Sequence, residues 1–401
     1  MKSFKKVLSA SVLGLVGAMF SPVVGIAIFG LSLLFGGGNA SGFAFTGIFD
    51  PSGLTLPTEG IKAISELIYS SKFASPAWKQ FMGVVPGIKN NKQIVVIGHY
   101  NGLAGAVKSA CDITPNPDKI GAVEKTWNPM YVSDRFEECY DNLQGTFWQY
   151  MLANGLKKED LTQSDYEGFV TKLLMEYMSD DMIYRLIFFT DTSIVAGVGN
   201  NLGAGQLKYF NMLDGVFKQC ETIVTATPAQ RVTITENAGV NYAAQAFATA
   251  SPTVHPATDY LNLLVYGATM ELRGVSDPVI LATQSFVDQY AQERKAVTNI
   301  ELAYTRIEGG IKSFEFNGIP VIPIFTWDRL IHRHFDDGTK WLNPHRALYT
   351  SKSNILVGTE EIANLGELSA EYNTYHKKFF SDFGFNFDVK VIEDAKIQYA
   401  Y

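Results

Sequence analysis

The sequence predicts an α+β protein, in which helices and strands occur in separate runs. Several long segments carry apolar residues at three- and four-residue steps, which is the spacing of amphipathic helices. Short runs such as residues 93–100 and 278–283 are rich in Val and Ile, as strands are. Because strands and helices do not alternate regularly, the pattern differs from that of a parallel α/β sheet.

The composition is that of an ordinary globular protein. Of the 401 residues, 47% are hydrophobic and 18% are charged, and the net charge is −7. Such a chain is long enough to bury one large core or a few smaller ones. Binding to a phosphate backbone needs a concentrated basic face, which this charge pattern does not provide, so direct recognition of nucleic acid is not expected.

The three cysteines, Cys111, Cys139 and Cys220, are far apart and have no CxxC spacing. They therefore indicate neither a zinc site nor a redox motif. We expect three buried free thiols and folding in a reducing compartment, with a single disulfide as the alternative.

The N-terminus is hydrophobic. A basic start, MKSFKK, precedes an uncharged run over residues 7–35, which Pro22 and several glycines interrupt, and GGGNASG follows. Three interpretations remain open: an export signal with a mature start near Ser41, a membrane helix, or an assembly segment that is buried or later cleaved.

The first soluble elements are a helix, a strand and a long loop. Thr58 can cap a helix that ends near Ser70, with apolar residues on one side. A strand is predicted over residues 93–100. Residues 101–129 are rich in Gly, Pro, Asn and Asp, which predicts a long loop or extended hairpin that acts as an arm outside the core.

Two helices follow. The first is predicted over residues 133–153 from its aromatic and aliphatic periodicity. The second is predicted over residues 162–189, where Thr162 can cap it with Asp165 placed as in a capping box. At about 1.5 Å per residue the second would be a rod of about 40 Å, a spine for the fold.

The rest of the chain alternates irregularly between the two kinds of element. Helices are predicted over residues 211–226, 259–272, 284–295 and 327–335, and strands over 231–237, 278–283, 312–318, 319–325, 345–359 and 383–392.

Candidate chemical motifs are weak. The glycine-rich segment 197–205 lacks the Lys-Ser pair of a phosphate-binding loop and is interpreted as a linker. His332 and His334 flank Arg333 on a predicted helix, where residues two apart do not share a face, so a solvated helix end is favoured over a metal site.

No catalytic arrangement is evident either. Six histidines leave a Ser-His-Asp arrangement open, but no G-x-S-x-G elbow occurs. The adjacent carboxylates Glu137-Glu138 and Asp180-Asp181 lie in predicted helices, where neighbours point in different directions. The sequence therefore predicts no catalytic residues, no cofactor site and no metal site.

Two C-terminal stretches carry a family resemblance. GGIKSFEFNGIPVIPIFTWDRLI and NPHRALYTSKSNILVGTE resemble the C-terminal part of major capsid proteins of tailed phages (Caudoviricetes) with the Hong Kong 97-like fold, in particular those of Bacteroides phages and prophages. The likeness is specific between residues 309 and 360, and extends as element order over residues 67–391. The matching positions are Phe316, Gly318, Ile319, Pro320, Val321, Asp328, Pro344, Ala347, Leu348, Thr350, Asn354, Ile355 and Gly358.

The resemblance implies an order of parts along the chain. These are a hydrophobic N-terminal segment (1–50), an N-terminal arm and helix (51–90), an extended loop that lies over an adjacent subunit (91–130), a peripheral domain with the spine helix (131–197), a mainly axial domain (198–345) and return strands (346–401).

Within the motif, Gly318 is expected to permit a tight turn between two strands. Pro320 and Pro323 are expected to keep the second strand at a sheet edge or kink, because proline cannot donate to a ladder. The charged residues after this strand are expected on an exposed end. The positions expected to make subunit contacts are Asp328, Arg329, Arg333 and Asp336.

The resemblance implies a structural protein and not an enzyme. Its partners would be further copies of itself in hexamers and pentamers, a scaffold or head protease, a portal, and packaged double-stranded DNA that is enclosed without sequence-specific binding. It would be located in the virion after assembly in the host cytoplasm. Two alternatives remain: a secreted or membrane-anchored surface protein, supported by residues 1–40, and a soluble α+β enzyme.

Overall fold

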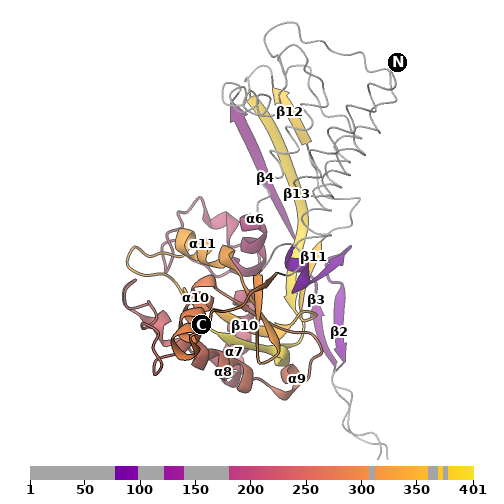
Figure 1. The fold of residues 1–401 in the computed structure, drawn as a ribbon. Coiled ribbons are helices and arrows are strands. Elements are labelled where there is room, and N and C mark those ends of the chain that lie inside the picture. The colour runs from indigo at the N-terminus through magenta and orange to yellow at the C-terminus, as the bar shows by residue number, and fades with distance from the viewer. Residues whose placement is uncertain (1–76, 98–121, 140–179, 307–311, 360–368, 374–377) are drawn as a thin grey trace, which may run out of the picture. The chain divides into compact units, whose positions relative to one another are not determined.

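A computed structural model describes residues 77–97, 122–139, 180–306, 312–359, 369–373 and 378–401. The chain splits into two compact units, each of which is described by itself. One is Met1–Ala74, Tyr131–Ser179 and Ile362–Phe385; the other is Ser75–Met130, Asp180–Glu361 and Asn386–Tyr401. Helices and strands are mixed within the described residues, which confirms the predicted α+β class (Figure 1).

The second unit is built on a seven-stranded mixed sheet. Its strand order is β5-β14-β10-β6-β9-β8-β7, with parallel pairing of β5 with β14 and of β6 with β9 and antiparallel pairing elsewhere. The strands are β5 (Arg231–Val232), β6 (Pro278–Ala282), β7 (Thr305–Arg306), β8 (Lys312–Phe316), β9 (Ile319–Pro323), β10 (Ala347–Ser351) and β14 (Ile397–Ala400).

β8 and β9 form the tight hairpin expected around Gly318. Asn317 and Gly318 both have positive φ, 52° and 77°, and Phe316 pairs with Ile319 across this two-residue turn. Asn-Gly is the favoured sequence for such a turn because both central residues need the left-handed region.

Of the two alternatives predicted for β9, a sheet edge or a kink, the edge is wrong, because β9 pairs with β6 on one side and β8 on the other. The two ladders are staggered. Pairing with β6 begins at Val321, so Pro320 lies before it, and pairing with β8 ends at Val321, so Pro323 lies beyond it. Each proline is thus outside one of the two ladders, where its missing N–H is tolerated.

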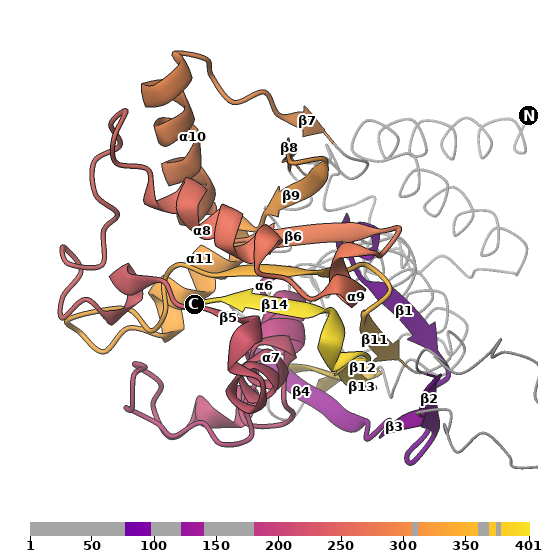
Figure 2. The same cartoon turned by 90° about the horizontal axis from the view of Figure 1, so that it is seen from below.

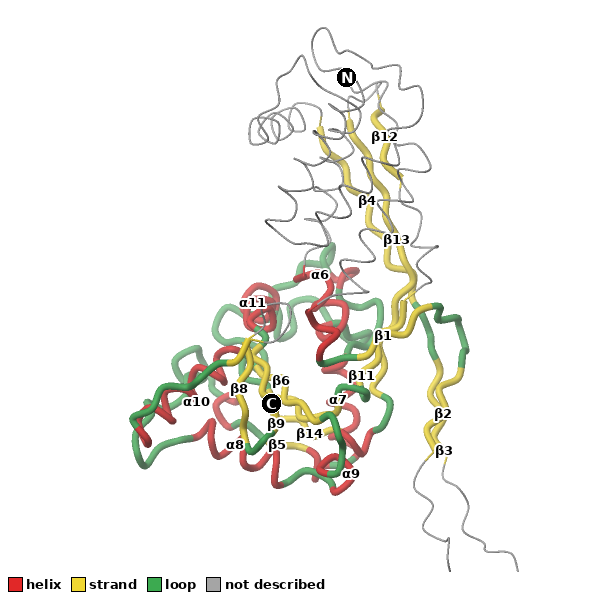
Figure 3. The backbone as a smooth tube through the Cα atoms, turned by 45° about the vertical axis from the view of Figure 1, so that its right-hand side comes forward, coloured by secondary structure: helices red, strands yellow, loops and turns green. Residues whose placement is uncertain are grey.

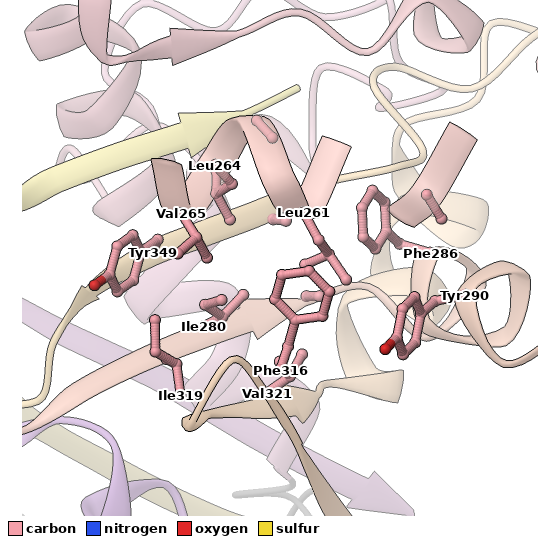
Figure 4. Close-up of a cluster of buried hydrophobic side chains, with 14 of the residues drawn as sticks. Leu261, Leu264, Val265, Ile280, Phe286, Tyr290, Phe316, Ile319, Val321 and Tyr349 are labelled. Atoms are coloured by element: carbon pink, nitrogen blue, oxygen red, sulfur yellow. The ribbon is translucent and has the colours of Figure 1, made fainter. Parts of the chain in front are cut away.

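One face of this sheet carries a mainly aliphatic core. Helices α8 (Pro256–Tyr266), α9 (Met270–Arg273) and α10 (Gln284–Thr298) contribute to it (Figure 2). Figure 4 shows Leu261, Leu264 and Val265 of α8 packed toward Ile280 and Val321 of the sheet. The motif residues Phe316 and Ile319 belong to the same cluster.

The opposite face is aromatic. It is covered by α7 (Val216–Ala226), α11 (Phe325–His334), α6 (Asp180–Tyr184) and the single π-helical turn η6 (Arg185–Phe189). The Trp327 ring lies edge-on to Phe188 and Phe217, each at 4.7 Å between centroids, and Phe217 stacks on Tyr399 of β14. Such edge-to-face contacts add to the burial energy of each ring.

A second, five-stranded sheet has the order β1-β11-β13-β12, with β4 also pairing with β13. β13 (Lys378–Val391) contributes its first part to one unit and its last part to the other. The remaining strands are β1 (Gly83–Pro86), β4 (Met130–Cys139), β11 (Ile355–Thr359) and β12 (Ser369–Asn373). Separately, β2 (Gln93–Ile97) and β3 (Ala122–Thr126) form an antiparallel ribbon (Figure 3).

The predicted first long helix is wrong in its described part, because residues 133–139 belong to strand β4, which pairs with β13. The second is helical over Asp180–Phe189 and ends where predicted. The residues 140–179 that were assigned to these helices lie outside the described residues. So do the N-terminal segment, the helix at 58–70 and most of the predicted arm, residues 98–121.

The remaining helices and strands largely follow the sequence. The helix predicted over residues 259–272 is two helices, α8 and α9, which are separated near Gly267. A side chain at Gly267 would clash, because its Cβ would lie 2.5 Å from the Leu263 carbonyl oxygen. The strand predicted over residues 231–237 is only two residues long, and a 3₁₀ turn, Thr235–Ala238, follows it.

Candidate functional site

The motif residues Thr350 and Asn354 form a buried polar clamp between β10, β11 and the C-terminal segment. The Asn354 side-chain amide donates to Thr350 Oγ1 and to the carbonyl oxygens of Glu393 and Lys396, at 3.1 to 3.2 Å. Its own oxygen accepts from the Glu393 amide at 2.7 Å, and Thr350 Oγ1 donates to the Lys396 carbonyl. Every hydrogen-bonding group of the amide is used, which buried polar groups require.

The motif residue Gly358 makes room for a tryptophan. A Cβ at this position would lie 2.7 Å from the Trp127 ring and 2.8 Å from the Ile88 side chain. Trp127 is almost fully buried, and it follows directly after β3. Any side chain larger than hydrogen would displace Trp127 from the strand on which it packs.

The motif residue Pro344 leads into a buried arginine. Arg346 donates from Nη1 to the Tyr399 hydroxyl at 2.9 Å and from Nε to the Asn343 carbonyl oxygen at 3.0 Å. Its guanidinium lies 4.5 Å from the Phe217 ring centroid, a cation–π contact. Burial raises the pKa of Tyr399, so its hydroxyl stays protonated beside this charge.

Asp328 caps a helix other than its own. Its two carboxylate oxygens accept from the backbone N–H groups of Gln284 and Ser285, the first residues of α10, at 2.6 and 3.0 Å. Burial raises the pKa of this carboxyl, and the hydrogen bonds from Ser285 and Gln284 oppose the rise. A carboxylate is favoured here because the N-terminal N–H groups of a helix carry partial positive charge.

Glu293 of α10 does the same for α8. It is fully buried and accepts from the amides of Ala257 and Thr258, from the Thr258 hydroxyl and from Gln289 Nε2, at 2.8 to 3.0 Å. Sequence analysis missed this residue. In the sequence, a glutamate in the last turns of an amphipathic helix indicates a solvent-facing position. The helix start that Glu293 caps, at Ala257, lies 36 residues away, so the sequence does not reveal the contact.

The predicted exposed end of α11 is partly engaged within the fold. Arg329 and Arg333 are exposed, and Arg329 pairs with Asp181 of α6. Asp336 accepts from the Tyr242 hydroxyl at 2.6 Å, which raises the pKa of that tyrosine to about 12, and from the Gly338 amide. With Asp328 and Asp336 engaged internally, Arg329 and Arg333 are the more available of the four predicted contact residues.

The two histidines of α11 have different neighbours. The His332 ring stacks on Trp341 at 4.1 Å, whereas His334 packs against Phe210. Burial lowers the pKa of His334 to about 4, with Arg333 and Arg185 adding to the effect. No group of three or more metal-ligating side chains occurs among the described residues.

The glycine-rich segment is an ordered turn and not a linker. Asn200 is buried at its centre, where its oxygen accepts from the amides of Gly197 and Leu202 and its amide donates to the carbonyls of Val195 and Val198. Those two backbone N–H groups are therefore unavailable to a phosphate. The next residue, Asn201, donates to the carbonyls of Arg333 and His334 at the end of α11.

Within the part of the chain that the structure describes, one serine and one histidine lie within hydrogen-bond distance. Ser285 Oγ lies 3.0 Å from His345 Nδ1, and His345 Nε2 lies 2.8 Å from the Gln245 carbonyl oxygen. Because Nε2 faces an acceptor it carries the proton, so Nδ1 accepts from the serine. The backbone amide of Ser285 already bonds Asp328, and burial lowers the pKa of His345. The pair therefore joins the segment containing Gln245 to α10, which is a structural role.

Among the described residues, no helix combines the length and the apolar character that crossing a membrane requires. The hydrophobic residues 1–40, on which the exported-protein alternative rests, are outside this part of the chain.

Comparisons with known proteins give structural likenesses only. No protein-family model matches the sequence, and no curated protein matches it. The chain is similar to a chain of the procapsid of satellite phage P4 with its size determination protein, at 11% identity and a TM-score of 0.47, covering 83% of this chain and 95% of that one.

Two further solved structures are similar in the same way. The capsid of cyanophage P-SCSP1u matches at 12% identity and a TM-score of 0.43, covering 82% of this chain and 88% of that one. An encapsulin complex from Synechococcus elongatus matches at 11% identity and a TM-score of 0.40, covering 82% and 88%. The chain has a mixed helix-and-sheet fold, and it is similar to chains of a phage procapsid, a cyanophage capsid and an encapsulin complex.

Proposed function

We propose that this chain is the major capsid protein of a tailed phage or prophage, with the Hong Kong 97-like fold. It would assemble into hexamers and pentamers of an icosahedral shell around double-stranded DNA. We further propose that it is of the Bacteroides phage or prophage type, which its two C-terminal stretches resemble.

The observation that carries this proposal is what the motif residues do. Phe316 and Ile319 fill the core beside the β8–β9 turn, Thr350 and Asn354 clamp the C-terminal segment, and Gly358 seats Trp127. These roles are architectural. The motif that resembles that of a family of shell proteins thus holds strands together in this chain.

The second line of support is the surface of the unit that contains the seven-stranded sheet, called the sheet unit below. Phe325, 61% exposed, lies on α11 with the Arg329 guanidinium over its ring, and Arg333 is exposed on the same helix. Arginine and aromatic side chains are enriched where proteins contact one another. We propose Arg329 and Arg333 as subunit contacts, with Asp328 and Asp336 shaping that surface from within.

The partners follow from the same proposal. A scaffold or head protease and a portal would act during assembly in the host cytoplasm, and the finished protein would be located in the virion. Packaged DNA would be enclosed without sequence-specific contacts, since the chain carries a net charge of −7.

The test is assembly by the full-length chain and by a version that starts at Ser41. Each is purified, sized by light scattering after gel filtration, and examined by negative-stain electron microscopy. Shells, capsomers or tubes of megadalton mass support the proposal. Comparing the two versions shows whether residues 1–40 act in assembly.

Two outcomes would count against a capsid protein. A monomer near 44.2 kDa from the full-length chain, and a slightly smaller monomer from the shorter version, would count heavily against the proposal. Recovery of the full-length chain in the membrane fraction, with the shorter version soluble, would favour the exported-protein alternative.

A further inference from the structure

The β2–β3 hairpin has only two strands, so its position depends on its root, the residues Asn91, Lys92 and Trp127 where it joins the rest of the unit. Two strands alone bury little surface, and an isolated two-stranded ribbon is marginally stable in water. Its five residue pairs run from Gln93–Thr126 to Ile97–Ala122. At about 3.4 Å per residue this described part is about 17 Å long, so a 10° rotation at the root moves its far end by about 3 Å.

The root itself is anchored by Trp127. This residue is buried over Gly358, and its backbone pairs with Lys92 and Asn91 on the other side of the ribbon. The next amide, of Asn128, donates to the buried Asp388 carboxylate at 2.7 Å. These contacts fix where the hairpin begins, but because they lie close together they oppose a rotation of the whole hairpin about Trp127 only weakly.

Lys125 makes a contact further out. It lies two residues before Trp127, on the same face of β3 because side chains alternate along a strand. Its ammonium group donates to the Val391 carbonyl oxygen at 2.7 Å and to Asp394 at 2.6 Å. Both acceptors belong to the C-terminal segment of the same unit. The Lys125 side chain is only 23% exposed, whereas Asp394 is 56% exposed.

We propose that Lys125 is a positioning residue, a strut that sets the direction in which the β2–β3 hairpin leaves the sheet unit. Trp127 is the pivot, and the contacts of Lys125 with Val391 and Asp394 limit rotation about it. The inference rests on the proposed function for its consequence: where the hairpin lies over a neighbouring copy, its direction sets the angle between copies and hence the curvature of the shell.

A strut of this kind is adjustable. Salt affects the contact with the neutral Val391 carbonyl little, whereas the contact with the exposed Asp394 carboxylate weakens as ionic strength rises. Lys125 also has a flexible four-carbon stem that holds its charge at several angles. The hairpin can therefore have a preferred direction and still yield to the different angles of five-fold and six-fold neighbours.

The first experiment tests the strut without reference to assembly. Spin labels are placed as unnatural amino acids at Val95 on β2 and Leu263 on α8, both exposed, in the full-length chain. We expect Lys125→Met to broaden the distribution of distances between the labels, and Lys125→Arg to restore most of the narrow distribution. The matched control is Lys295→Met, which removes another lysine–carboxylate contact, with Glu301 at 3.1 Å, away from the hairpin.

The distribution of label distances distinguishes a strut from a residue that only stabilises the fold. If Lys125→Met leaves the distances as narrow as in the wild type, the strut does not exist and the inference is overturned. If Lys295→Met broadens them equally, the effect is general loosening and the inference is again overturned.

The second experiment measures shell diameters by electron microscopy. The wild type and Lys295→Met are expected to give one narrow size class, and Lys125→Met a diameter spread at least twofold wider, with open or tubular particles. Should Lys125→Met give the wild-type spread, the link to curvature fails. A wild type that forms no particles would contradict the proposed function, and the label distances would still decide the role of Lys125.

Discussion

The two faces of the seven-stranded sheet are packed in different ways. The face under α8 and α10 is filled mainly by branched aliphatic side chains such as Ile280, Val321 and Leu264. The face under α7 and α11 is filled by interlocked rings around Trp327, with the buried charge of Arg346 among them. Aliphatic packing depends on total volume, whereas ring packing also depends on orientation, so the second face is expected to be less tolerant of change.

The largest effect is expected from Trp327→Ala. Trp327 is fully buried and contacts Phe188 and Phe217 with its ring edge-on, so its loss leaves a cavity in the aromatic face. The free energy of unfolding should fall by about 3–5 kcal/mol, measured by denaturant titration with circular dichroism.

Trp327→Phe is the matched variant. It keeps a ring and removes an indole N–H that has no hydrogen-bond partner, so it should cost about 1 kcal/mol or less. Equal losses for the two variants would show that this face is not held by ring volume.

The next largest effect is expected from Arg346→Met. The substitution leaves the buried Tyr399 hydroxyl without its donor and the Phe217 ring without its cation. We expect a loss of about 2–3 kcal/mol in the same titration.

Arg329→Met provides the comparison for a surface charge. Arg329 pairs with Asp181 at the protein surface, where such pairs contribute about 1 kcal/mol or less. If both arginine variants lose the same amount, the buried cation adds nothing special to the aromatic face.

Acid should weaken both faces through one histidine each. Burial lowers the pKa of His334, beside Phe210, to about 4, and also lowers that of His345, beside Phe247. A histidine whose pKa is lower in the folded state stabilises the fold above its unfolded value near 6.5 and loses that contribution as pH falls toward the folded value. Stability should therefore decline between pH 6.5 and about 4, by at most about 1.4 kcal/mol per pH unit for each histidine.

The measurement is a series of melting temperatures from pH 7.5 to 4.5. His334 is partly exposed, so solvent screens its charge and reduces its contribution to the slope, and His345→Gln should remove more of the slope than His334→Gln. Asp328 acts in the opposite direction, since its raised pKa favours the fold at lower pH. A slope that is unchanged in both variants would assign the acid sensitivity to other groups.

The smallest effect is expected from Ile280→Val on the aliphatic face. Removing one methylene there should cost about 0.5–1.5 kcal/mol, because the neighbouring side chains can partly close the gap. The same denaturant titration checks it. A loss as large as that of Trp327→Ala would erase the distinction between the faces.

Local pattern predicted much of this architecture. The α10 helix, strands β6, β8 and β9, and the Gly318 turn were predicted close to their observed bounds, because each has a clear periodicity or a turn residue. The single strand predicted over residues 345–359 is instead two strands, β10 and β11, which belong to different sheets. Strand β4 was mistaken for a helix. The apolar periodicity that predicted the helix comes mostly from residues after Cys139, so it does not bear on β4 itself, which pairs with β13 more than two hundred residues away.

The roles of the site residues could not be predicted in the same way. Asn354 and Gly358 were identified only through a family resemblance, and what they do depends on Glu393, Lys396 and Trp127. Asp328 was expected at a subunit contact, yet its oxygens bond the start of α10, 44 residues earlier. Hydrogen bonds between distant segments leave no periodic trace in a sequence.

The two borrowed caps have a consequence for the order of synthesis. The start of α8 is completed by Glu293 of α10, and the start of α10 is completed by Asp328 of α11. During synthesis, α8 and α10 each leave the ribosome before the residue that caps their N-terminus. Helices α8 and α10 should therefore stay loosely formed until residue 328 has emerged. The sheet closes later still, because β10 and β14 lie between β5 and β6 and are made last, so its edges stay open to those of another nascent chain until the C-terminus is free.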